Sequence, residues 1–196
     1  MMVDIDLDSA IKKVFGGKMH KTILAMILIL ISCVFVYAIQ KETDWIKFTT
    51  PEGRFSLLLP HEPKLEVVSD PADAKLTHNR FSEFEDGYAF IIEYFDNVSI
   101  TDPEKYLDSA SRGIVDAIKG TLVRESKTTL EGYPGRELEL SLTSSNGTAV
   151  SGRTRIYAVG SSFYSMSYVW RKDIDAARAS EIGEKYFSSA KLTPSK

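Results

Sequence analysis

Apolar residues recur with two different periods in the chain after residue 44, and the change of period predicts which segments are strands and which are helices. Alternation of apolar and polar residues indicates a strand, whereas apolar positions three or four apart indicate a helix. The alternation predicts strands at residues 45–49, 54–59, 76–84, 88–95, 121–130, 136–142, 150–159 and 163–170. Residues 60–75 contain three prolines and several charges, and we expect them to form an irregular connection.

Turn signals join these strands into hairpins. Asp86-Gly87 separates two of them and is a strong hairpin signal. The strand that follows, YAFIIEYF, is apolar on both faces, as is typical of a central strand. Residues 132–135 and Asn146-Gly147 predict the next two turns. Glu137 and Glu139 alternate with leucines, so we expect their carboxylates to face solvent.

Two helices are predicted by start signals and by helical spacing. Thr101 or Asp102 as the cap, followed by Pro103, is a typical helix start, and the apolar spacing continues to Gly120. A last helix begins after Asp173 or Asp175. This order of elements predicts an α+β fold with a single, mainly antiparallel sheet and helices packed on it. Burial on both faces of the central strand allows a three-layer α/β/α sandwich.

An uncharged segment of eighteen residues, 22–39, precedes this domain. Its length lies within the range of about 17–25 residues that one transmembrane helix needs. Four lysines precede it, and no excess of positive charge follows it. The positive-inside rule therefore predicts a cytoplasmic N-terminus and an extracytoplasmic C-terminal domain in the cell membrane. The resulting organisation is a tail (1–21), a transmembrane signal anchor (22–39), a stalk (40–44) and a domain (45–196).

Two other fates fit the same apolar segment. It resembles a secretory signal peptide with a cleavage site after Ala38, and Leu30-Ile31-Ser32-Cys33 resembles a lipobox in which Cys33 would carry the lipid. A chain that started at Met19 would read as a shorter, more signal-like leader. The residues leave these alternatives open.

Composition narrows the function classes. The chain has 24 Lys and Arg against 27 Asp and Glu, for a net charge of −3, and it lacks the basic patch that nucleic-acid binding needs. Cys33 is the single cysteine, so the predicted domain has no disulfide and no cysteine ligand. No glycine-rich loop leads into a helix, and we expect no cofactor.

Candidate catalytic and metal-binding residues are few. His61 and His78 are the histidines of the predicted domain, and neither accompanies a nucleophile motif. The only group with suitable metal donors is His61, Glu62, Asp70, Asp73 and His78, and its spacing matches no zinc site. We therefore expect the domain not to be an enzyme. The alternative is a small envelope hydrolase or metal-dependent enzyme that uses His61 or His78.

One predicted strand face combines positive charge with aromatic rings. Arg153, Arg155 and Tyr157 share a face of their strand, and the next strand presents Tyr164, Met166, Tyr168 and Trp170. Arginine and aromatic residues are enriched at binding hot spots, so this face is a candidate partner-binding surface. The competing interpretation is that the aromatics face the core and the arginines face solvent.

Three segments resemble a known group of exported domains. WIKFTTPEGRFSLLLP, LEGYPGRELEL and EKYFSSAKL are similar to parts of the PsbP and DcrB-like α/β/α sandwich domains. The resemblance implies this fold and a mostly non-enzymatic role, and it assigns no functional residue. Together with the apolar segment, it predicts a membrane-tethered extracytoplasmic binding or accessory module whose partners are the membrane and another envelope protein, through protein or small-ligand contacts.

Overall fold

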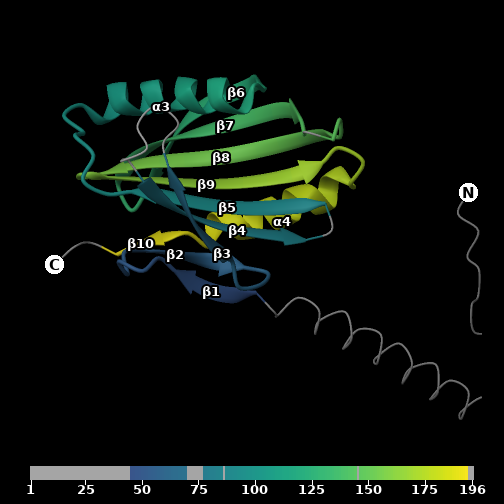
Figure 1. Cartoon of the computed structure of the whole chain (residues 1–196), viewed down its shortest axis with the longest axis horizontal. Helices are drawn as coiled ribbons and strands as arrows, with labels where there is room; N and C mark the ends of the chain where they lie inside the picture. The colour runs from purple at the N-terminus through teal and green to yellow at the C-terminus, as the bar shows by residue number, and fades with distance from the viewer. Residues whose placement is uncertain (1–44, 70–76, 86, 145, 194–196) are drawn as a thin grey trace, which may run out of the picture. The chain divides into compact units, whose positions relative to one another are not determined.

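The computed structural model describes residues 45–69, 77–85, 87–144 and 146–193. Within Trp45–Lys196, a compact unit, the elements follow one another from β1 to β10, with helices α3 and α4 (Figure 1). Their bounds are β1 (Ile46–Thr49), β2 (Phe55–Leu59), β3 (Lys64–Ser69), β4 (Thr77–Glu85), β5 (Tyr88–Phe95), α3 (Pro103–Ile118), β6 (Thr121–Leu130), β7 (Tyr133–Thr143), β8 (Ala149–Val159), β9 (Ser162–Arg171), α4 (Ala176–Ser188) and β10 (Lys191–Leu192).

The strands form two antiparallel sheets. A seven-stranded sheet has the order β3-β4-β5-β9-β8-β7-β6, and a three-stranded sheet has the order β1-β2-β10. The predicted α+β class is confirmed, but the prediction of a single sheet was wrong. The reason is that β2 pairs with β1 on one side and with β10 on the other, where Leu192 lies opposite Phe55.

The seven-stranded sheet separates two helical layers. Successive residues of a strand point to opposite faces, and Ile156 of β8 packs in a cluster with Leu107 of α3. The next residue, Tyr157, belongs to the cluster that contains Phe187 of α4. Helix α3 therefore covers one face, whereas α4 and the three-stranded sheet cover the other, which we call the α4 face.

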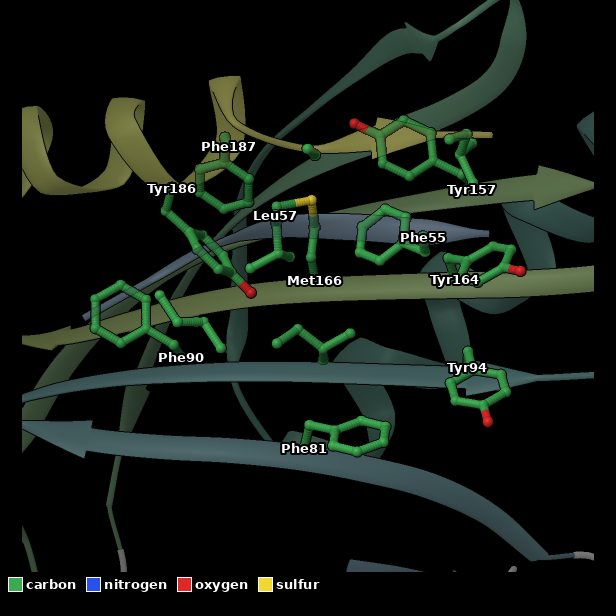
Figure 2. Packing of buried hydrophobic residues seen from close by; sticks show 14 of the residues in the cluster. Phe55, Leu57, Phe81, Phe90, Tyr94, Tyr157, Tyr164, Met166, Tyr186 and Phe187 are labelled. Carbon is green, nitrogen blue, oxygen red and sulfur yellow. The ribbon is translucent and has the colours of Figure 1, made fainter. Parts of the chain in front are cut away.

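Aromatic residues dominate the core on the α4 face. Figure 2 shows Tyr186 and Phe187 of α4 lying with side chains of β2, β5 and β9. Phe55 stacks on Tyr164 at 5.2 Å, and the ring of Phe90 meets that of Tyr186 edge-on at 5.2 Å. Such large buried rings contribute much of the hydrophobic stabilisation.

Several predicted boundaries differ from the structure. Residues 64–69 form β3 rather than an irregular connection, because they pair with β4 in regular antiparallel register. Helix α3 is capped at Lys119, which takes a left-handed conformation, one residue before the predicted Gly120. The turn between β6 and β7 consists of Glu131 and Gly132, so the strand already begins at Tyr133.

The predicted tail, the segment 22–39 with Cys33, and the stalk 40–44 lie outside the described residues. Neither helix in the described part of the chain is long and apolar enough to span a membrane.

Candidate functional site

A ladder of charged side chains crosses the α4 face. Glu137 of β7 lies opposite Arg155 of β8 and accepts a hydrogen bond from its guanidinium. Arg153 lies 3.9 Å from the same carboxylate and donates a hydrogen bond of 2.7 Å to Glu184 of α4. The prediction that Glu137 is solvated was wrong, because its side chain is only 13% exposed between the two arginines.

In the structure the two strand faces coincide, so these arginines lie beside aromatic rings, and Tyr164 and Tyr168 are buried in the core, as the competing interpretation expected. Arg153 lies opposite Tyr168 in the register of β8 and β9, and Tyr157 lies opposite Tyr164. The guanidinium of Arg153 also lies 4.3 Å from the centre of the Phe187 ring, and that of Arg155 lies 4.8 Å from it. Cation–π contacts of this kind hold α4 against the sheet.

The exposure of the three predicted residues differs. The side chains of Arg153 and Arg155 are 16% and 21% exposed, whereas Tyr157 is 1% exposed. Tyr157 therefore belongs to the core, and burial raises the pKa of its hydroxyl. That these residues bind a partner stays a prediction.

A cleft of about 450 Å³ opens next to this ladder, between α4 and the strands β7, β8 and β9. We call it the α4 cleft. It is lined by Val123, Glu139, Leu140, Ser141, Ser151, Gly152, Arg153, Tyr168, Trp170, Lys172, Ala176, Ser180 and Gly183. The volume falls in the range of about 300–1,000 Å³ that small-ligand sites occupy.

Two polar atoms of the cleft lining are buried without a hydrogen-bond partner. They are the hydroxyl of Tyr168 and Nη2 of Arg153. A buried polar group that lacks a partner costs about 1–3 kcal/mol, so native proteins seldom leave such atoms unpaired. Burial, followed by the neighbouring Tyr88, raises the pKa of Tyr168, and the positive charges of Arg153 and Arg178 partly oppose this shift. Tyr168 is therefore a neutral donor at physiological pH.

The cleft also holds a lysine that sequence reasoning missed. The Nζ of Lys172 donates a hydrogen bond of 2.8 Å to Ser141 Oγ, and Lys172 follows Trp170, which stacks on Tyr168 at 5.0 Å. No sequence motif marks this group, because its members come from β6 to β9 and from α4. The alternation of apolar and polar residues along β9, which singled out Tyr168 and Trp170, was the one sequence feature that pointed to this cleft.

The two candidate histidines lie apart from the cleft. The Nδ1 of His61 is 3.2 Å from Oε1 of Glu83, and the histidine side chain is 65% exposed while the glutamate is 6% exposed. Burial is the largest cause of the raised pKa of Glu83, and His61 partly opposes it. This is a histidine–carboxylate pair at the surface.

His78 has a different environment. Its ring stacks on Phe95 at 4.2 Å, and its Nε2 lies 3.4 Å from Oε1 of Glu93. His78 and Glu83, the partner of His61, are five residues apart in β4 and therefore point to opposite faces of the sheet, so the structure does not bring the two histidines together. Asp70 and Asp73 of the candidate metal group lie outside the described residues, and no group of three or more metal-binding side chains occurs among the residues described.

Comparison with known proteins concerns the fold. No protein-family model matches the chain, and no curated protein matches its sequence. The solution structure of the cyanobacterial PsbP protein CyanoP from Synechocystis sp. PCC 6803 matches with a TM-score of 0.53 at 10% identity, over 76% of this chain and 93% of that chain. The domain thus has the PsbP-like fold that the sequence resemblance implied.

Two further solved structures are similar at lower scores. A crystal structure from Bacteroides thetaiotaomicron matches with a TM-score of 0.49 at 12% identity, over 78% of this chain. The match spans only 50% of that longer chain. LpqN of Mycobacterium tuberculosis, described as involved in cell envelope biogenesis, matches with a TM-score of 0.47 at 16% identity, over 76% of this chain and 91% of that chain.

Proposed function

We propose that this protein is a non-enzymatic binding or accessory module of the cell envelope. Segment 22–39 tethers it to the membrane, and domain 45–196 lies on the extracytoplasmic side. The observation that carries the binding role is the α4 cleft, which has the volume of a ligand site and is lined by the partly buried Trp170 and by Lys172.

The chemistry of the cleft supports binding rather than catalysis. Its lining includes Ser141, Ser151 and Ser180, but no histidine is among the lining residues. A serine nucleophile needs an adjacent general base. The carboxylate of Glu139 is engaged by Arg124, and the amine beside Ser141 belongs to Lys172, an exposed residue, whereas lysines that act as general bases are buried. The alternative enzyme, which would use His61 or His78, needs one of them beside a nucleophile in a pocket.

The tether rests on the charge distribution in the sequence. Lysines precede segment 22–39, and a short polar stalk follows it, so the domain would remain close to the bilayer surface. A reporter that is active only outside the cytoplasm, fused after Lys196, tests this placement. We expect activity in intact cells and extraction of the protein by detergent. A reporter active only in the cytoplasm would overturn the placement.

Crosslinking in intact cells tests the binding role. A photoreactive residue at Ser180, on the cleft side of α4, is compared with one at Ser109 of α3. Both serines are exposed helical residues, and their helices cover opposite faces of the seven-stranded sheet, so they form a matched pair. We expect a discrete crosslinked product from position 180 only. Equal crosslinking at both positions, or none at either, would contradict binding at the cleft.

A further inference from the structure

We propose that the α4 cleft binds a small organic monoanion with a planar apolar body, whose anionic group lies at Lys172 and whose planar part lies along Trp170. This inference rests on the proposed binding function and names its ligand class. It follows from the charge balance of the lining, from the aromatic side chains at the cleft and from the ammonium donor of Lys172.

The charge balance of the cleft favours a single negative charge on the ligand. Its charged lining residues are Glu139, Arg153 and Lys172. Glu139 is paired with Arg124, and Arg153 with Glu184. Lys172 donates to the neutral hydroxyl of Ser141 and forms no ion pair with a carboxylate among the described residues. One positive charge therefore remains uncompensated within the described lining.

The shape of the lining favours a planar group. The rings of Tyr168 and Trp170 are stacked at an interplanar angle of 23°, and Trp170 is only partly buried. Aromatic side chains pack well against other rings in offset or edge-on geometry.

The hydrogen-bond donor that lines the cleft also suits an anion. It is the ammonium group of Lys172, which donates to Ser141 Oγ. A carboxylate or sulfonate oxygen is a stronger acceptor for an ammonium group than a neutral hydroxyl is.

Titration calorimetry on the purified full chain tests this inference with two probes of equal shape. Naphthoate carries the negative charge, whereas naphthamide has the same rings without it. Each probe is measured with the wild type, with Lys172→Gln and with the matched control Lys64→Gln, which removes a lysine from the exposed edge strand β3. Ser180→Phe, at an exposed position of the lining, is designed to fill the cleft without disturbing the core.

We expect naphthoate to bind the wild type about tenfold more tightly than naphthamide, since a hydrogen bond to a charged group contributes that order of affinity. Lys172→Gln should remove this preference, Lys64→Gln should keep it, and Ser180→Phe should abolish binding of both probes. Equal affinity of the two probes for the wild type would overturn the inference. So would an equal effect of both lysine variants, or the lack of binding at millimolar concentration.

The outcome separates this inference from the proposed function. A module that crosslinks at position 180 in cells but shows no charge preference in calorimetry keeps its binding role and loses this ligand class. A reporter confined to the cytoplasm would overturn the envelope placement whatever the calorimetry shows.

Discussion

Glu104 of α3 accepts a hydrogen bond of 2.7 Å from Arg136 of β7. The same guanidinium nitrogen donates to Asp108 one helical turn later, also at 2.7 Å. The Arg136 side chain is 5% exposed, so these carboxylates compensate a positive charge that is buried between helix and sheet. The contact fixes α3 on the face opposite to α4.

The first prediction concerns stability in acid. Hydrogen bonds from Lys127 and Arg136 lower the pKa of Glu104 below its usual value of 4.5. A carboxyl with a lowered folded-state pKa contributes stability above its unfolded pKa and loses that contribution as the pH falls through the folded value. We expect Glu104→Gln to be less stable than the wild type at neutral pH. The difference should shrink below about pH 4.5, as urea denaturation at several pH values would measure.

The control for this variant is Glu181→Gln, at an exposed position of α4. It should follow the wild type at every pH. A stability difference for Glu104→Gln that is constant from neutral to acid pH would contradict the electrostatic explanation.

The second prediction is that removal of a carboxylate increases stability at neutral pH. The pKa of Glu83 is raised, chiefly because the carboxylate is buried, and one of its oxygens has no hydrogen-bond partner. A carboxyl with a raised folded-state pKa costs stability as the pH rises above its unfolded value. Glu83→Gln removes this cost, so we expect the variant to be more stable than the wild type at neutral pH. Denaturant titrations should show the two proteins converging as the pH falls below about 4.5.

The control for Glu83→Gln is the same substitution at an exposed glutamate. Glu62→Gln, next to His61, should leave stability unchanged. If Glu83→Gln instead destabilises the domain at neutral pH, the hydrogen bond between Glu83 and His61 outweighs the cost of burying the carboxylate.

Local sequence signals correctly predicted turns and helix starts, where one or two residues determine the backbone conformation. Asp86-Gly87 correctly predicted the hairpin in which Glu85 lies opposite Tyr88, and Asp102 is the N-cap of α3 as expected. Strand β3 was not predicted because the prolines before it and the charged residues within it are typical of a loop. An edge strand of this kind lacks the apolar alternation that marks the other strands. Strand β10 contains only two residues, and nothing but its pairing with β2 defines it.

The candidate site was only partly predictable for a different reason. Alternation grouped Arg153 with Tyr157 along β8, and Tyr168 with Trp170 along β9. That the two groups share one face follows only from the register of the two strands. The carboxylate partners of the arginines come from β7 and α4, and the sequence of one strand says nothing about which helix covers it. Lys172 and Ser180 line the same cleft because α4 packs on the sheet. No short sequence motif predicts that packing.

The third prediction concerns the turn between β6 and β7. Glu131 and Gly132 form a two-residue loop with φ values of 49° and 85°, and a turn with two positive φ angles favours Asn-Gly. The left-handed conformation is unfavourable for glutamate and better tolerated by asparagine. We expect Glu131→Asn to stabilise the domain by about 0.5–1 kcal/mol in thermal or urea denaturation. Glu131→Gln, which removes only the charge, should have no effect, and equal stabilisation by both would contradict the backbone explanation.

The fourth prediction compares the two helix glycines 113 and 183. A Cβ at Gly113 of α3 meets no atom within 4 Å, so Gly113→Ala should stabilise the domain by about 1 kcal/mol through helix propensity. A Cβ at Gly183 of α4 would lie 3.1 Å from the ring of Tyr168, and Phe90 and Trp170 stack against that ring. Crowding of a well-packed site costs about 1–3 kcal/mol. We therefore expect Gly183→Ala to be less stable than the wild type in urea denaturation, despite the gain in helix propensity. Equal stabilisation by both alanines would mean that the Tyr168 ring moves into the α4 cleft at little cost.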